Sequence, residues 1–343
     1  MVAGGGIRPT AGAGLTRTPI LMHSRFHAAL TVAAAVLLAV TIAGSCGAWH
    51  WLLDLASHFR WYGLLAAGAG VVLAARRPRS LAMACAGLAL AGNAWALLPC
   101  WLPPPATSAV AVAAETESAV PPLSLILSNL HHRNADRSLA VAYLRDRAPD
   151  VAVLLEVDAA WATDLSSLDA LYPFRIVEPQ AGSFGIALLS RWPLEDGRVV
   201  ALGGTPFPNI VATVRFHGRG IRVVATHPHP PLDAVNAAAL QAQLVGVAAV
   251  AAGSRAPCIV AGDFNATPWS LGYRTFAARS GLRDTALGRG VQPTWNARLP
   301  APRIPIDHVF ASPDLAVLRR AVGPDVGSDH FPVEVTLGLP PAD

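Results

Sequence analysis

The longest apolar run of the sequence restricts what the chain can fold into, because residues 28–53 contain no Asp, Glu, Lys or Arg. A run of that length is enough for a membrane-spanning helix of roughly 20 residues. Two more apolar stretches follow at residues 61–75 and 80–101, and Gly and Ala dominate both, as in helices that pack closely in lipid. We therefore predict three transmembrane helices within residues 27–101. For the short middle stretch, a re-entrant or interfacial segment is the alternative.

The distribution of Arg predicts the orientation of these helices. Three Arg residues precede the first apolar run and three lie in residues 76–79, whereas none occurs from residue 80 until Arg133. Positively charged loops stay on the cytoplasmic side, so the chain after Trp101 is expected outside. We predict a multi-pass protein of the inner (cytoplasmic) membrane with an extracytoplasmic, periplasmic C-terminal domain. A cleaved signal peptide is the weaker alternative, because two more apolar stretches follow the first.

The charge balance differs between the two parts of the chain. Residues 1–122 contain 7 Arg and 3 acidic residues, whereas residues 123–343 contain 19 of each. The second part therefore lacks the basic footprint of a nucleic-acid-binding domain. Only 14% of all residues are charged, where a soluble domain has about a quarter, which agrees with a membrane segment. The four Cys residues show neither metal-ligand spacing nor a disulfide framework and indicate structural thiols.

Composition also predicts the domain boundaries. Residues 1–26 are expected to be a disordered N-terminus, in which Met22 is a candidate for the true start. Residues 102–122 are rich in Pro, Ala, Ser and Thr and are typical of a linker. Residues 123–343 alternate short β-rich runs with helical stretches, which predicts one α/β or α+β domain. The expected strands are 123–130, 151–157, 184–190, 209–216, 221–227, 258–264, 306–312 and 333–339, and the expected helices are 135–147, 159–169, 233–252 and 269–280.

Polar side chains collect at the ends of these predicted strands. Each has a structural explanation by itself: Gly-Asp-x-Asn, for example, is common turn chemistry. Together they are harder to explain, since an unpaired carboxylate in an apolar strand is costly. Carboxylates with Asn are hard oxygen ligands suited to Mg²⁺ or Mn²⁺, and His beside Asp adds general acid–base capacity. The set predicts hydrolysis of a phosphate ester; it consists of Asn129, Glu156, His227, Asp263, Asn265, Asp307, Asp329 and His330.

The order of these motifs resembles the endonuclease/exonuclease/phosphatase superfamily, the DNase I-like hydrolases, across residues 123–339. The motifs are Asn129, Glu156, GIALLSR at 185–191, TH at 226–227, GDFN at 262–265, IDH at 306–308 and SDH at 328–330. The resemblance implies a four-layer α/β sandwich, here preceded by three transmembrane helices, with the active site at one rim of the strands.

The resemblance also implies a role for each residue on the metal side. Glu156 would ligate a divalent ion, Mg²⁺ or Mn²⁺, helped by Asn129 and Asp329. Two positions depart from the common pattern. His308 stands where many members carry Tyr, which is expected to alter packing more than chemistry. Leu155 precedes Glu156 where many nucleases have Gln, which disfavours the nuclease version of the site.

The remaining residues would carry the chemistry. By resemblance, Asp263 would position or deprotonate the attacking water, and Asn265 would hold the phosphate. His330 would contact the phosphate and support in-line attack, oriented by Asp307, while His227 would assist at the phosphate or the leaving group. The general base is left open between Asp263 and His330.

The resemblance extends to membrane-anchored bacterial members of the superfamily, which suggests the substrate class. A site tethered close to a bilayer meets lipid head groups at high effective concentration. We therefore predict a lipid-linked or small phosphoester or pyrophosphate as substrate, with the lipid bilayer as partner and no protein partner. An extracytoplasmic nuclease is the alternative, although nucleic acid is not favoured by a neutral domain. A catalytically silent, membrane-tethered binding domain is a further alternative, opposed by the filled catalytic positions.

Overall fold

The computed structural model describes residues 17–102 and 120–340. Most of the predicted N-terminal segment and of the predicted linker lies outside these residues. In the described part, helix α1 (Arg17–Ser45) extends into residues predicted to be disordered. Pro19 lies in the first helical turn, where the missing N–H costs nothing.

The first apolar run contains a helix of the predicted spanning length and the start of a second, short helix. Helix α1 ends at Ser45, and a separate short helix, α2 (Trp51–Ser57), follows after a turn. Gly47 lies in this turn, where a Cβ atom would stand 2.5 Å from Oδ1 of Asp54. The chain therefore folds back on itself before α3 begins.

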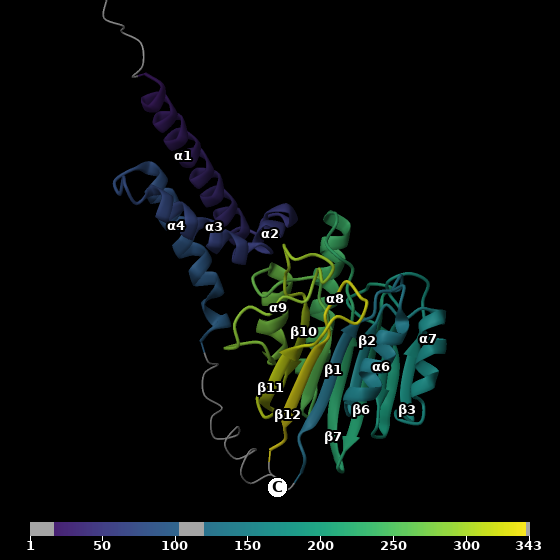
Figure 1. Cartoon of the computed structure of the whole chain (residues 1–343). Coiled ribbons are helices and arrows are strands. Elements are labelled where there is room, and N and C mark those ends of the chain that lie inside the picture. The colour runs from purple at the N-terminus through teal and green to yellow at the C-terminus, as the bar shows by residue number, and fades with distance from the viewer. Residues whose placement is uncertain (1–16, 103–119, 341–343) are drawn as a thin grey trace, which may run out of the picture.

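Helices α3 (Arg60–Ala74) and α4 (Leu81–Leu97) pack against α1, and a 3₁₀ turn, η1 (Leu98–Cys100), follows α4. Polar contacts join the three helices: the Asn93 amide donates to Oγ1 of Thr41 at 2.9 Å, and Arg60 donates to Oγ of Ser45 at 2.8 Å. Interhelical hydrogen bonds of this kind are typical of helices that pack in lipid. Figure 1 shows these helices leading away from the rest of the molecule.

Three helices in the described residues are long and apolar enough to cross a membrane: Ser24–Ser45, Leu81–Cys100 and Ala234–Ala252. The last of these is α8 of the C-terminal domain, which packs Leu240, Leu244 and Val247 into a buried cluster. Helix α3, by contrast, has only 15 residues. Length and composition therefore support α1 and α4 as spans and leave α3 short.

The C-terminal domain contains two six-stranded sheets. The first has the order β11 (Ala316–Val322), β12 (Val333–Gly338), β1 (Leu123–Asn129), β2 (Val151–Leu155), β4 (Ile186–Ser190), β3 (Phe174–Glu178). The second has the order β5 (Leu194–Ala201), β6 (Pro208–Phe216), β7 (Arg219–Thr226), β8 (Cys258–Asp263), β10 (Asp307–Ala311), β9 (Arg283–Asp284). Strands β1 and β2 pair in parallel, as do β7 and β8.

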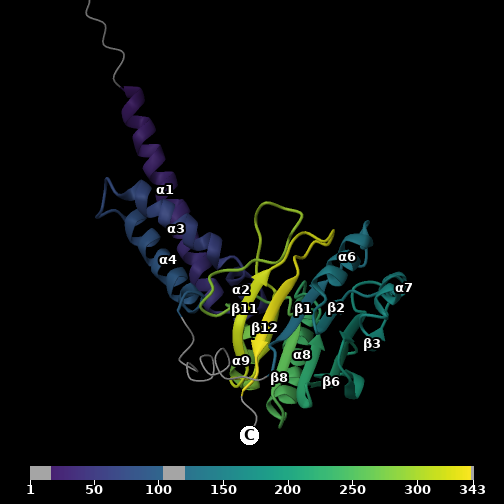
Figure 2. The ribbon, with the colours of Figure 1, turned by 60° about the horizontal axis from the view of Figure 1, so that its bottom comes forward.

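The two sheets pack face to face, and helices cover their outer faces (Figures 1 and 2). The inner layer is one apolar cluster formed by alternate residues of both sheets, such as Leu125, Val153 and Val223. Helices α6 (Arg137–Arg147) and α7 (Ala159–Leu165), with the 3₁₀ turn η2 (Ser166–Leu168), cover the first sheet. Helices α8 (Ala234–Ala252) and α9 (Leu271–Ser280) cover the second. The predicted four-layer α/β sandwich is confirmed.

The prediction missed four strands, and these are the four edge strands of the two sheets. β3, β5, β9 and β11 lie at the ends of the two strand orders. The exposed pattern of β5, Leu194–Ala201, shows why: its side chains are mostly in solvent, so it lacks an apolar run.

Candidate active site

The polar residues expected at strand ends meet at one rim of the sandwich. Asn129 is the last residue of β1 and Asp263 the last of β8, while Glu156 follows β2 and His227 follows β7. The carboxyl ends of parallel neighbours lie at the same edge of a sheet. A hydrogen bond of 3.2 Å from the Asn129 amide to Oδ2 of Asp263 joins the two sheets there.

Asp263, Asp307 and His330 form a buried cluster at the centre of this rim. The antiparallel pairing of β8 with β10 sets Asp307 opposite Asp263. Nδ1 of His330 lies 2.8 Å from Oδ2 of Asp307, and its Nε2 lies 3.6 Å from Oδ2 of Asp263. Burial alone would lower the pKa of His330, but the two carboxylates outweigh it and raise this pKa to about 10. The imidazole is therefore held in its charged form.

The Asp263 carboxyl group is fixed in place and titrates near neutrality. Burial and the neighbouring Asp307 raise its pKa to about 7, against the lowering influence of His330. The backbone N–H of Asn265 donates to its Oδ1 at 2.8 Å. Asn265 adopts a left-handed conformation with φ 48°, which Asn tolerates, and its side chain donates to the Pro228 carbonyl at 3.0 Å. A carboxyl group with this pKa suits a general base.

His227 contacts the same carboxylate but is neutral, whereas His330 is charged. Its Nε2 lies 3.5 Å from Oδ2 of Asp263. Burial lowers the pKa of His227 to about 4, although the nearby Glu156 acts against this change. Asp263 thus stands between a charged imidazole, His330, and a neutral one. Titratable groups whose environments drive their pKa values apart are typical of acid–base sites.

Glu156 is the centre of the candidate metal side. Its Oε1 accepts from the Asn129 amide at 3.1 Å, and its Oε2 lies 2.7 Å from Nδ1 of His132. Nδ1 of His131 lies 3.8 Å from the same Oε2 and 3.1 Å from Oδ1 of Asp329. Burial would raise the pKa of Glu156, but its charged and hydrogen-bonded neighbours lower it. The backbone of Glu156 has φ 60°, a strained conformation for this residue that is common at functional sites.

Sequence reasoning missed His131 and His132. They follow the expected Asn129 in the stretch SNLHH, so the signal was the adjacent pair of imidazoles directly after a site residue. The side chains of His131, His132 and Glu156 are close enough to share one metal ion. The set thus contains softer nitrogen donors beside the predicted oxygen donors.

The donor set fits a divalent cation. Glu156 and Asp329 supply hard carboxylate oxygens, and the buried Oδ1 of Asp329 has no well-aligned hydrogen bond. Nδ1 of His132 contacts Glu156, and Nδ1 of His131 contacts Asp329. These ring nitrogens would have to be unprotonated to bind a metal ion. Asn129 turns its amide nitrogen, not its oxygen, toward Glu156, so ligation by Asn129 requires a half-turn of its amide.

His308, which stands in place of a common Tyr, has a packing role. Its Nδ1 lies 2.9 Å from Oδ2 of Asp284 and its Nε2 lies 2.9 Å from the Ala266 carbonyl oxygen, so both ring nitrogens are engaged. The ring also contacts Phe264 edge to face. It takes no part in the cluster at the rim.

The site opens into a cleft of about 700 Å³. Its polar lining contains Glu156, His227, Asp263, Asp329 and His330. Its apolar lining includes residues of α2 and Phe59, two residues after the end of α2, and no local sequence pattern predicts them here. The lining from this N-terminal region is Trp51, Leu55, His58 and Phe59.

Comparison with known families agrees with this geometry. The sequence profile of the Endonuclease/Exonuclease/phosphatase family matches residues 126–330, more than half of the chain. The chain belongs to this family. Members are divalent-metal-dependent phosphoesterases and nucleases, so the protein is an enzyme of the phosphoric ester hydrolase class. A search of curated proteins gave no match.

Solved structures share the fold. The endonuclease/exonuclease/phosphatase from Beutenbergia cavernae DSM 12333 is 29% identical, with 64% of this chain and 72% of that chain covered and a TM-score of 0.55. D. rerio TDP2 complexed with single strand DNA product is 21% identical, with 63% and 98% covered and a TM-score of 0.55. The human Nocturnin catalytic domain with bound sulfate anion is 22% identical, with 64% and 95% covered and a TM-score of 0.53.

Proposed function

We propose that this protein is a membrane-anchored phosphoesterase that hydrolyses a lipid-linked or small phosphate ester or pyrophosphate by in-line attack of water. The observation that carries the proposal is the placement of Asp263 between charged His330 and neutral His227 at the rim of the cleft. Such a cluster supplies a proton acceptor and a cationic donor within reach of one phosphate group.

Asp263 is the general base in this proposal. His330 is held charged and engages Asp307 through Nδ1, so its Nε2 donates to a phosphoryl oxygen rather than accepting a proton. The Asp263 carboxyl group, with a pKa of about 7, accepts the proton of the attacking water. His227 is neutral and assists at the phosphate or the leaving oxygen. Asn265, beside the same carboxylate, holds the phosphate with the second hydrogen of its side-chain amide, the first of which donates to the Pro228 carbonyl.

The metal in this proposal is Mg²⁺ or Mn²⁺, held by Glu156 and Asp329 with Asn129, and with His131 and His132 beside them. When bound, it polarises the phosphoryl oxygen and stabilises charge on the leaving oxygen. The carboxylates suit Mg²⁺, and the two imidazoles favour acceptance of Mn²⁺ as well.

The membrane anchor consists of the helices that precede the domain. Helices α1 and α4 have the length and hydropathy of spans, and α3 lies between them. The Arg-rich loop at 76–79 favours a cytoplasmic position for that loop and an extracytoplasmic position for the catalytic domain. The neutral charge of residues 123–343 favours a lipid-linked or small substrate over nucleic acid.

Phosphate release from a polyprenyl pyrophosphate tests the proposal. The purified full-length protein is assayed in lipid nanodiscs with Mg²⁺ or Mn²⁺. The Asp263→Ala variant is the blank, and the matched control is Asp146→Ala on the exposed face of α6. We expect release by the wild type and by Asp146→Ala, and a loss of at least about a hundredfold in Asp263→Ala.

The outcomes separate the alternatives. Equal activity of Asp263→Ala and the wild type would remove Asp263 from the chemistry. No release by folded, metal-loaded protein that instead cleaves DNA would favour the extracytoplasmic nuclease. Inactivity toward both substrate classes would contradict the proposed substrate.

A further inference from the structure

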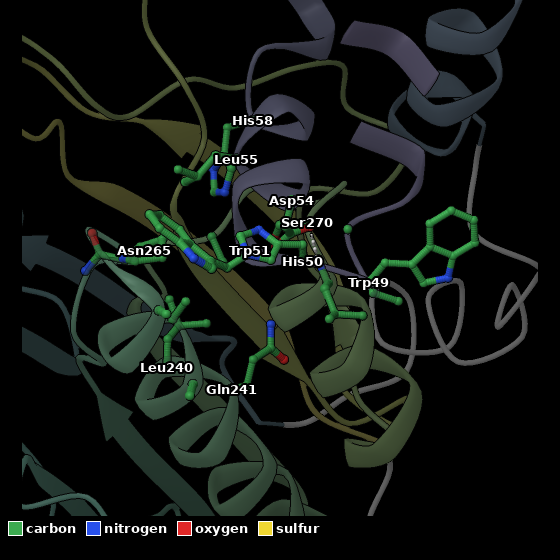
Figure 3. Close-up of a pocket in the computed structure, with 18 residues that line it drawn as sticks. Trp49, His50, Trp51, Asp54, Leu55, His58, Leu240, Gln241, Asn265 and Ser270 are labelled. Carbon is green, nitrogen blue, oxygen red and sulfur yellow. Dashed lines mark hydrogen bonds between the residues drawn. The ribbon is translucent and has the colours of Figure 1, made fainter. Parts of the chain in front are cut away.

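Helix α2 and the turn before it, residues 46–59, sit on the catalytic domain beside the active site. Figure 3 shows His50, Trp51 and Asp54 facing Leu240 and Gln241 of α8 across a cavity. This cavity has a volume of about 260 Å³. Trp51, Leu55 and His58, one stripe of α2 and its C-cap, line both this cavity and the catalytic cleft, as does Asn265. Helix α2 thus contributes to the walls of two neighbouring cavities.

A hydrogen bond fixes α2 to the domain. Oδ1 of Asp54 accepts from the backbone N–H of Leu271 at 2.8 Å, at the first residue of α9. Ser270 is the N-cap residue of α9 but makes no side-chain capping bond. Asp54 therefore caps α9 from a distant part of the chain, and its negative charge is favourable at a helix N-terminus.

Two further contacts hold the neighbouring segments. The Tyr62 hydroxyl donates to the Arg303 carbonyl oxygen at 3.1 Å, in the loop that carries Ile304 of the cleft. Leu97 of α4 is fully buried against Trp269 of the domain, with Trp61 packed beside them. The position of α2 over the cleft is therefore set by several contacts with the domain.

The cleft has an apolar lining beside its charged groups. Leu55 and Phe59 of the N-terminal region contribute to this lining, as do the Pro-Pro-Leu residues 230–232. Ile304 and Ile306 complete the apolar lining. A ligand that fills this cleft therefore meets both charged groups and hydrocarbon.

Exposed apolar side chains lie near the cleft. Trp49, in the turn before α2, is 83% exposed, while Leu232 of the cleft lining is 73% and Val235 at the start of α8 is 77% exposed. Apolar patches on a surface mark an interaction site, and Trp is favoured where a protein meets the lipid interface. Since α2 connects α1 to α3, these side chains lie near the membrane surface if those helices enter the membrane.

We propose that α2 is the substrate-selecting wall of the active site and that the site takes a phosphorylated amphiphile from the membrane surface. The phosphate binds at Asp263 and His330, and the hydrocarbon chain lies between Leu55, Phe59 and the loop 229–232. This inference rests on the proposed function and specifies its substrate class. A nucleic-acid duplex has no hydrocarbon chain to place against this wall, so the wall disfavours it as a substrate.

A chain-length series tests the wall. The substrates are isopentenyl, geranyl and farnesyl pyrophosphate, and kcat/KM of the full-length protein in nanodiscs is measured for each. The variants are Leu55→Ser, which removes an apolar lining residue, and the matched control Leu52→Ser on the same helix, which lines neither cavity. We expect kcat/KM of the wild type to rise with chain length, by up to roughly fourfold for each methylene that enters the groove.

Leu55→Ser should flatten this dependence, whereas Leu52→Ser should keep the wild-type slope. An unchanged slope in Leu55→Ser, or an equal loss in both variants, would overturn the role of α2. Cleavage of duplex DNA in preference to every pyrophosphate of the series would overturn the substrate class.

A binding measurement separates this inference from the proposed function. A dodecyl phosphate with a diazirine at its terminal carbon is photolysed on the Asp263→Ala variant, and labelled peptides are mapped by mass spectrometry. We expect labels in residues 51–59 and 229–232, reduced in the double variant with Leu55→Ser. If the wild type hydrolyses no pyrophosphate but labelling follows this pattern, the proposed reaction fails while the binding wall stands. Labelling scattered over other surfaces contradicts the wall itself.

Discussion

Two histidines on one carboxylate define the chemistry at the level of single residues. His330 and His227 lie 3.6 and 3.5 Å from the same oxygen of Asp263. Only His330 has a second carboxylate, Asp307, on its other ring nitrogen. That one contact explains why His330 stays charged while the equally buried His227 is neutral, because an opposite charge offsets desolvation.

These shifts predict how the stability of the metal-free protein depends on pH. Burial raises the pKa of Asp263 from 3.8 to about 7, so its ionisation destabilises the folded state as pH rises through this window. The folded-state pKa of His330 is raised from 6.5 to about 10, so its contribution is complete below pH 6.5 and is lost as pH rises toward 10. Stability without metal should therefore fall with rising pH in both windows.

Thermal unfolding of the EDTA-treated protein between pH 4 and pH 10 measures this dependence. His330→Gln should remove the decrease toward pH 10. Because His330 lowers the pKa of Asp263, the same variant should move the Asp263 decrease to higher pH. Asp307→Asn should lower the pKa of His330, which NMR titration of its ring reports. A double variant His330→Gln, Asp263→Asn that keeps the wild-type decrease above pH 6.5 would show that another group titrates there.

Glu156 should control metal affinity. It accepts hydrogen bonds from the Asn129 amide and the His132 backbone N–H, and its Oε2 lies 2.7 Å from Nδ1 of His132 and 3.8 Å from Nδ1 of His131. Glu156→Gln removes one negative charge at nearly constant volume, so we expect the Mn²⁺ dissociation constant to rise by at least about tenfold. Electron paramagnetic resonance of free Mn²⁺ measures it. Glu178→Gln on the edge strand β3 is the control and should bind as the wild type does; equal affinities in both variants would place the metal elsewhere.

At the scale of elements, helix α9 is capped by a residue from a distant part of the chain. Helix α9 begins at Leu271, shortly after the Asp263–Asn265 turn. Its N-terminus receives a carboxylate from α2 rather than from its own N-cap side chain. This hydrogen bond links α2 to the catalytic domain, in addition to the contacts of Tyr62 and Leu97.

Removal of this cap should loosen the first turn of α9. Asp54→Ala leaves the Leu271 N–H without its partner, and loss of a capping side chain costs about 0.5–2 kcal/mol. Hydrogen exchange of residues 271–274 should accelerate, and the midpoint of thermal unfolding should fall. Asp54→Asn keeps an acceptor oxygen and should restore most of the protection. If exchange in Asp54→Ala matches the wild type, the contact does not hold α2 on the domain.

At the scale of the whole molecule, the N-terminal helices are in contact with the sandwich. Their contacts run through α2, Tyr62 and the end of α4, and Figure 1 shows α2 between the other N-terminal helices and the sandwich. Because the Arg-rich loop 76–79 is expected in the cytoplasm, the domain is expected on the opposite side.

A reporter fusion tests this orientation. Alkaline phosphatase fused after Asp343 folds only in the periplasm, so the fusion should be active if the domain is extracytoplasmic. The same reporter inserted after Arg77 should be inactive. The reverse pattern would overturn the orientation and with it a substrate taken from the outer surface of the membrane.

The sequence by itself determined the central strands and the set of polar side chains at their ends. Apolar runs such as 151–155 and 258–261 can only be buried, and a polar residue directly after such a run must emerge at the rim. The edge strands were not predictable in this way. An edge strand such as β5 is exposed and gains its conformation from pairing with a neighbour, not from its own apolar pattern.

Only the tertiary structure decided which of these polar residues share a proton and which element covers them. The charge of His330 depends on Asp307 at 2.8 Å, and the neutrality of His227 depends on burial, neither of which is encoded near those residues in the chain. In the sequence, the start of α2 is only the end of the apolar run 28–53. Its place in the active-site wall follows from a hydrogen bond between Asp54 and Leu271, whose separation in sequence no local pattern can bridge.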